Sequence, residues 1–207
     1  MTGTDKQARF YPYWERFAAS SARGETTSRL PPGDELAALR RGTSGGPGTV
    51  PSMWRFYTPD WTDERAGLGA PFSLVAEHHA LVLFAIHQQS QQVLVHQPGK
   101  PIGQAIKALH TSGRFAPAAV DRRFFAAVTA PEVAEVAHHL RGLVRQLRSL
   151  QGPAPFDYSG LCRDLRWWHD PACRDAARRR WGMDYYRPTP DGPDTLPASR
   201  EPAGEVS

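Results

Sequence analysis

The sequence contains only two cysteines in 207 residues, Cys162 and Cys173. Their number and spacing give neither a CxxC pair nor the disulfide framework that small secreted domains use. No apolar run approaches the roughly 18 residues that a membrane-spanning helix needs. The first ten residues also lack the apolar core of a signal peptide. We therefore expect a cytoplasmic protein with no membrane partner.

The sequence signatures of catalysis and cofactor binding are missing as well. The motifs GxxxxGK[ST], GxGxxG, GxSxG and HExxH do not occur, so no phosphate-binding loop, dinucleotide site, serine nucleophile or zinc-protease helix is indicated. His78, His79 and His87 lie in an apolar stretch, where we expect them to be core residues rather than metal ligands. We predict that the protein is not an enzyme and that it binds no cofactor, no metal and no small-molecule substrate.

Lysine is scarce, and the basic residues are unevenly distributed. Of the 25 Lys and Arg residues only three are lysine. Residues 1–99 hold nine basic and nine acidic residues, residues 100–182 hold fourteen and seven, and residues 183–207 hold two and five. Arginine binds phosphate through two parallel hydrogen bonds and stacks on planar groups. A basic second half rich in arginine therefore favours an anionic partner such as nucleic acid.

The apolar residues recur at helical spacing, and no segment alternates as a strand would. In the first half we expect helices within 5–22, 34–41 (with Asp34 as N-cap) and 53–57, a mobile glycine-rich loop over 42–51, and a buried central helix over 70–89. In the second half we expect helices over 102–109, 120–128, 129–150, from Asp157 or Ser159 to 168, and from Asp170 to about 181. Thr129 and Glu132 have the spacing of a capping box.

These elements predict an all-α fold. We expect a small N-terminal helical part over residues 1–97 and a C-terminal basic bundle of four to five helices over residues 98–186. Residues 187–207 are acidic, rich in proline and poor in apolar residues, which predicts a disordered tail. Within the bundle we expect Trp167, Trp168 and Trp181 to be core residues rather than base-stacking platforms, although Trp167 lies off the apolar side of its helix.

Several helices should present arginine away from the core. Arg141, Arg145 and Arg148 stand at i, i+4 and i+7, so they form one row beside the Leu/Val stripe of their helix. No acidic residue lies three or four positions from any of them. A phosphate backbone is the natural partner of such a row, because its charge repeats regularly. Further cations that should project outward are Lys107, Arg122, Arg163, Arg166 and Arg174.

The alternative interpretation is a solvated surface with local ion pairs. Asp170 is spaced to pair with Arg174, and Asp175 with Arg179, each for only about 0.3 kcal/mol. The row of three arginines has no such partner, so there we favour nucleic-acid binding. This hypothesis requires basic side chains from separate helices to converge on one surface in the folded protein.

Several segments, taken in order, resemble the CasB family, the small subunit of the type I-E CRISPR Cascade complex. They are a helix containing Trp14, then Glu35–Arg41, Met53–Tyr57, His79–Ile86, Ile102–Leu109, Val120–Phe125, Leu140–Val144, Leu161–Trp168, Arg179–Trp181 and Asp184–Tyr186. The resemblance spans roughly residues 10 to 186. The loop over 42–50 and the C-terminal tail have no counterpart that we can match.

The resemblance implies an all-helical, non-catalytic subunit. It implies that two copies stack head to tail in the crRNA-containing complex, contact its backbone and large subunits, and help to hold the target and displaced DNA strands of the R-loop. Basic positions that match the family are Arg40, Arg41, Lys107, Arg122, Arg123, Arg141 and Arg163.

Two other functions remain open from the sequence. A helix-turn-helix transcriptional regulator would concentrate its contacts on one recognition helix, whereas the basic residues here are spread over several helices. A purely structural helical adaptor would present the same arginines to acidic protein. Binding to unrelated DNA sequences distinguishes the three functions, because the regulator prefers one site, the subunit prefers none and the adaptor does not bind.

Overall fold

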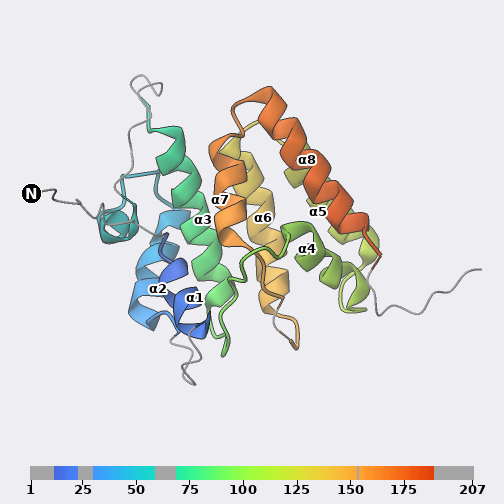
Figure 1. Ribbon diagram of the computed structural model, residues 1–207, viewed down its shortest axis with the longest axis horizontal. Helices are drawn as coiled ribbons and strands as arrows, with labels where there is room; N and C mark the ends of the chain where they lie inside the picture. Colours follow the sequence, from blue (N-terminus) through green and yellow to red (C-terminus); the bar gives the residue numbers. More distant parts are fainter. Residues whose placement is uncertain (1–11, 23–29, 59–68, 153, 189–207) are drawn as a thin grey trace, which may run out of the picture.

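The computed structural model describes residues 12–22, 30–58, 69–152 and 154–188. Within these ranges the chain forms eight α-helices and two short 3₁₀ helices, and the β-structure amounts to one isolated bridge between His96 and Phe156 (Figure 1). The predicted all-α class is confirmed. The elements are α1 (Glu15–Ala22), α2 (Gly33–Arg40), η1 (Arg41–Thr43), η2 (Pro51–Phe56), α3 (Phe72–Gln88), α4 (Ile102–Thr111), α5 (Pro117–Thr129), α6 (Val133–Arg148), α7 (Tyr158–Arg166) and α8 (Pro171–Tyr186).

Helix α3 is the centre of the molecule, as its apolar sequence predicts. Almost all of its side chains are buried, and it packs against α2, α6 and α7. Its polar residues have partners: His78 Nδ1 lies 2.8 Å from the Tyr57 hydroxyl, and His87 Nδ1 lies 3.1 Å from the Tyr158 hydroxyl. Burial lowers the pKa of His87 to about 3, so the ring is neutral at pH 7. The prediction that the histidines of this stretch belong to the core is confirmed for His78 and His87, whereas His79 is only half-buried.

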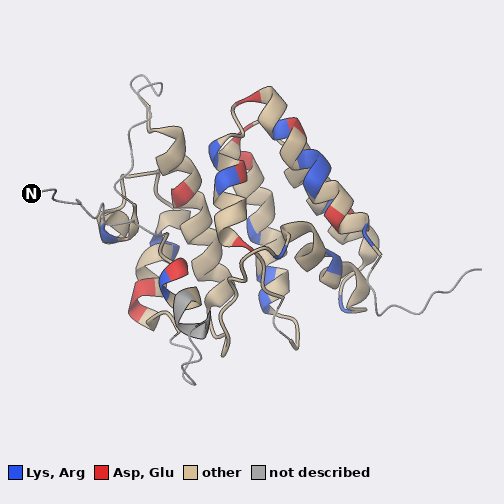
Figure 2. Ribbon diagram, viewed as in Figure 1, with Lys and Arg blue, Asp and Glu red and all other residues tan. Residues whose placement is uncertain are grey.

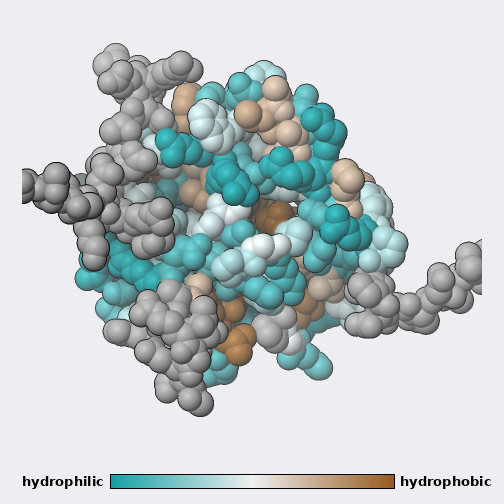
Figure 3. Space-filling view, in the orientation of Figure 1, coloured by the Kyte–Doolittle hydropathy of each residue, from teal (hydrophilic) through white to brown (hydrophobic). Residues whose placement is uncertain are grey.

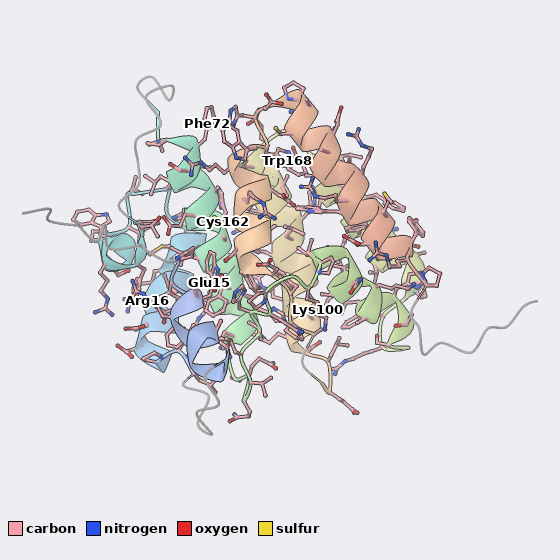
Figure 4. All side chains as sticks on the ribbon, in the orientation of Figure 1. Glu15, Arg16, Phe72, Lys100, Cys162 and Trp168 are labelled. Carbon is pink, nitrogen blue, oxygen red and sulfur yellow. The ribbon has the colours of Figure 1, made fainter. Side chains whose placement is uncertain are left out.

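The N-terminal helix α1 is tied to the second half of the chain by polar contacts. Glu15, labelled in Figure 4, accepts a hydrogen bond from the Ser159 hydroxyl at the start of α7. Its carboxylate also lies 3.2 Å from His96 Nε2. The Tyr158 backbone N–H donates to His96 Nδ1, so Nε2 carries the proton and donates to Glu15. These bonds fix α1 against α7 across a long separation in sequence.

The five helices of the second half pack in pairs, α4 against α8 and α5 against α6, with α6 and α7 also covering α3. Gly103 on α4 meets the backbone of α8, where a Cβ atom would lie 2.5 Å from the Trp181 carbonyl oxygen. The two helices therefore approach more closely than any side chain at position 103 would permit. One continuous apolar cluster includes residues from both sides of position 97.

Two of the expected helix caps are present and two are not. Asp157 accepts from the Gly160 N–H at 2.9 Å and Asp170 from the Cys173 N–H at 2.9 Å, as predicted. The capping box was wrong: Thr129 is the last residue of α5 and its hydroxyl donates to the Phe125 carbonyl, and Glu132 precedes α6 without a side-chain cap. Asp34 was also wrong as an N-cap, because α2 already begins at Gly33 after Pro32.

The core prediction is confirmed for Trp168 and Trp181, which are buried. Trp167 is 48% exposed and is not a core residue, in keeping with its place off the apolar side of its helix. The face shown in Figure 3 is mostly hydrophilic and carries only small, separate hydrophobic patches. Of the predicted tail, only residues 187 and 188 lie within the described ranges. In the described part of the chain, no helix meets the length and hydrophobicity that crossing a membrane requires, and no three His, Cys, Asp or Glu side chains form a metal-binding group.

Candidate nucleic-acid interface

Three arginines form a row along α6, which we call the α6 basic row: Arg141, Arg145 and Arg148. Arg145 is exposed, and the other two are half-buried at its sides. Arg141 Nη1 donates to the Thr43 carbonyl oxygen at 3.3 Å, and Arg148 Nη1 donates to Gln89 Oε1 at 2.6 Å. Among the described residues, no carboxylate pairs with any of the three. The row therefore retains its full positive charge at the edge of α6 that faces η1 and the end of α3.

The electrostatics of the row favour an anion. Burial, and then the positive charge of Arg145, lower the pKa of Arg141. The nearby histidines do not add charge, since burial lowers the pKa of His79 to about 4 and that of His87 to about 3. The guanidinium groups of Arg141 and Arg145 repel each other, and no charged histidine offsets or adds to this repulsion. A negative group placed between them therefore stabilises both.

Neighbouring elements extend the basic surface on both sides of α6. On α5, the exposed Arg123 approaches α6 at Gly142, where an added Cβ would lie 4.0 Å from Arg123 Cδ. On the other side, Thr43 belongs to the three-residue helix η1, which begins at Arg41. Arg40 is half-buried at the end of α2, and Arg41 is exposed. Positions that are far apart in the sequence thus meet at α6.

The α7 arginines lie elsewhere. Arg163 is exposed and Arg166 half-buried, and both line a recess of about 250 Å³ together with Glu77, Cys162 and other residues of α3 and α7. The described residues that line this recess include none from α6. Figure 2 likewise shows the basic residues of α6 and α7 as separate groups. The structure therefore brings Arg123 of α5 and the Thr43 carbonyl of η1 beside α6, whereas the α7 arginines lie outside this surface.

A comparison with family models identifies the chain. The model for CRISPR-associated protein Cse2 matches residues 35–186, a range that includes every residue of α5 to α8, η1 and η2. The chain belongs to the Cse2 family. This confirms the resemblance to CasB that the sequence motifs indicated.

Solved structures agree with the Cse2 fold. The crystal structure of CasB from Thermobifida fusca is 24% identical, with a TM-score of 0.62, and the match covers 84% of this chain and 94% of that one. The crystal structure of a CRISPR-associated Cse2-family protein from Thermus thermophilus is also 24% identical, with a TM-score of 0.55, and the match covers 85% of this chain and 99% of that one. A search of the curated proteins found no match.

Other predicted cations of this Cse2-family chain make contacts within the fold. Lys107 donates to the Arg187 carbonyl, and half-buried Arg174 lies 3.5 Å from the Trp168 carbonyl oxygen rather than pairing with Asp170. Arg122 is exposed on α5. Lys107 and Arg174 therefore each contact the chain at one end of α8. These two hydrogen bonds compete with the binding of either side chain to nucleic acid.

Two features of the Cse2-family chain were missed in the sequence. Arg178, rather than Arg179, pairs with Asp175, and it also donates to the carbonyls of Val128, Thr129 and Ala130 at the end of α5. Trp54 is 57% exposed, although it lies in the apolar segment of η2. The spacing of Trp54 from Met53, Phe56 and Tyr57, which are all buried, was the available signal that it points outward.

Proposed function

We propose that this chain is the non-catalytic small subunit of a type I-E CRISPR Cascade complex, and that it holds nucleic acid by the sugar-phosphate backbone. The observation that carries the proposal is the α6 basic row, whose three arginines have no carboxylate partner among the described residues and which Arg123 and η1 extend. Membership of the Cse2 family supports a role within a CRISPR complex. The partners are then the crRNA-containing complex with its backbone and large subunits, the target and displaced DNA strands, and a second copy of the chain stacked head to tail.

A backbone-binding surface suits this role on energetic grounds. R-loop formation is nearly balanced, because the RNA–DNA duplex gained is about as stable as the DNA duplex lost. A few phosphate contacts therefore suffice to shift the balance, and they do so without reading sequence. The row offers repeated guanidinium groups along one helix edge. Such a surface binds phosphates by charge and spacing and does not select a particular base.

The test is a salt titration of single-stranded DNA binding by filter retention. We compare wild type with Arg141→Ala/Arg145→Ala. Each phosphate contact on single strands contributes about 0.7 to the slope of log K against log salt. The double variant should therefore bind more weakly at low salt, with a slope reduced by about 1.4. Circular dichroism should show an unchanged helical content, because Arg145 is exposed and half-buried Arg141 gives up only one long hydrogen bond, to the Thr43 carbonyl.

The matched control is Arg179→Ala/Arg180→Ala, which removes the same charge from two exposed positions on α8. This variant also removes the ion pair between Arg180 and Asp164, whose atoms lie 2.6 Å apart. Asp164 keeps its hydrogen bond from the Trp181 indole N–H. The control should retain nearly all of the slope. Equal loss in both double variants, or unchanged binding in Arg141→Ala/Arg145→Ala, refutes the α6 assignment. A strong preference for one duplex sequence would instead favour a transcriptional regulator, and no binding at low salt would favour a structural adaptor.

A further inference from the structure

Trp54 is an exposed ring that the fold holds in a fixed orientation. Its indole Nε1 donates to the Gly48 carbonyl oxygen at 2.8 Å, and its side chain is 57% exposed. Gly48 adopts a positive φ of 73°, which a residue with a Cβ rarely adopts. A Cβ there would also lie 3.1 Å from Leu74 Cδ2 of α3. The glycine-rich segment that the sequence predicted as a mobile loop thus supplies the hydrogen bond that orients Trp54.

The segment that carries Trp54 is anchored to the core. Met53 and Phe56 are buried on the other side of η2, and the Ser52 hydroxyl lies 3.4 Å from the Ala38 carbonyl oxygen of α2. The one hydrogen-bonding group of the indole is used within the protein. What remains for a ligand is the aromatic surface of the ring, which contributes by stacking.

The surroundings of Trp54 are basic. A shallow groove of about 570 Å³ runs between α2 and η2, and Trp54 lines it together with Arg41 and Arg55. Asp34 is the one acidic residue among the described residues of this groove. Both arginines are exposed. An aromatic ring that shares a groove with two exposed cations has the chemistry that binds a nucleobase and its flanking phosphates.

The short helix η1 takes part in both the groove and the α6 basic row. Arg41 is the first residue of η1, and Thr43, the last residue of the same short helix, accepts the hydrogen bond from Arg141. A strand whose phosphates contact Arg145 and Arg141 would have to cross η1 to reach Arg41. Trp54 is the exposed aromatic residue of the groove that Arg41 lines.

We propose that Trp54 is a base-stacking residue for single-stranded nucleic acid, at the end of a path that runs from the α6 basic row across η1 to the groove between α2 and η2. This inference rests on the proposed function. The occupant is a single strand, because a duplex hides the faces of its bases in its own stack. Duplex DNA offers only its backbone to such a surface.

The test uses the full-length protein with a single-stranded oligonucleotide that carries 2-aminopurine, and the matching duplex. Stacking on an indole quenches 2-aminopurine fluorescence, so wild type should quench the single strand on binding. Trp54→Ala should lose this quenching and weaken single-strand affinity by about 5- to 100-fold, the range expected for one base–aromatic stack. Trp54→Phe keeps a ring and should retain most of the quenching. Duplex affinity should change less than twofold in both variants.

Trp167→Ala is the matched control, because Trp167 is a comparably exposed tryptophan (48%) on the recess of α7, outside the proposed path. It should leave affinity and quenching unchanged. The inference is overturned if Trp54→Ala binds and quenches like wild type, if it weakens single strand and duplex equally, or if Trp167→Ala shows the loss instead. The arginine double variant separates the two proposals: if it loses binding while Trp54→Ala does not, the proposed function stands and the stacking role fails.

Discussion

The close approach of α4 and α8 gives a quantitative prediction for Gly103→Ala. An added Cβ would lie 2.5 Å from the Trp181 carbonyl oxygen, 2.8 Å from the Tyr185 nitrogen and 2.9 Å from Asp184 Cβ. Ordinary non-bonded separations are about 3.5–4.0 Å. Two of these three atoms belong to the backbone of α8, which no rotamer change relieves. The helix as a whole must therefore move by about 1 Å to accept a methyl group.

Two opposing effects set the size of the change. Alanine is favoured over glycine inside a helix by about 1 kcal/mol. Overpacking a well-packed contact costs about 1–3 kcal/mol, more when backbone must shift. At Gly103 the second effect is larger, so we expect the free energy of unfolding to fall by about 1–2 kcal/mol. At Gly182, also inside a helix, a Cβ would meet nothing within 4 Å, so Gly182→Ala should gain up to about 1 kcal/mol.

Urea denaturation followed by far-ultraviolet circular dichroism measures both variants on the same scale. We expect the two midpoints to move in opposite directions from wild type, Gly103→Ala to lower and Gly182→Ala to higher urea. In a thermal melt each kcal/mol corresponds to roughly 2–4 °C for a domain of this size. If Gly103→Ala is as stable as wild type, or gains stability like Gly182→Ala, then the helices are not held together by that glycine and the reasoning is wrong.

Two further predictions concern buried polar groups. Arg178→Ala removes the guanidinium that donates to three carbonyls at the end of α5, so unfolding free energy should drop by about 2–3 kcal/mol in urea denaturation, and Arg178→Lys should recover part of it. Burial raises the pKa of Glu77 to about 7 against hydrogen bonds from Thr58 that lower it. Between about pH 4.5 and 7 the unfolded chain loses the Glu77 proton while the folded chain keeps it, so the free energy of unfolding of wild type falls by up to about 3 kcal/mol as pH rises. Glu77→Gln has no proton to lose at this position, so its free energy of unfolding relative to wild type should rise across that window.

Controls for these two predictions are available in the same chain. Arg179→Ala removes an exposed neighbour of Arg178 and should change stability by less than about 0.5 kcal/mol. A loss of that small size for Arg178→Ala would mean that the end of α5 does not depend on the guanidinium. For Glu77, the variant-minus-wild-type difference cancels the buried histidines, which titrate in both proteins. A difference that stays flat from pH 4.5 to 8 would contradict the raised pKa.

The helices themselves follow from the sequence. The near-continuous apolar sequence of α3 requires the helix to be buried on all sides, because any exposed side would leave apolar surface in water. The caps Asp157 and Asp170 were predictable because an N-cap bond is local and joins residues three positions apart. The Thr129 cap was wrong because a threonine hydroxyl also bonds backward to the carbonyl four residues before it, and α5 used that alternative.

The sequence alone determined which side of each helix faces the core, and so it identified the α6 basic row and placed Trp167 off the apolar side of its helix. A helical wheel fixes side chains around their own axis only. The surface that those side chains share depends on how the helices are rotated against one another, and that rotation is set by contacts such as Gly103 against α8. Only the tertiary structure therefore brought Arg141 beside Thr43, placed the α7 arginines elsewhere, made Arg178 a cap for another helix, and fixed the ring of Trp54 with a carbonyl from a glycine-rich loop.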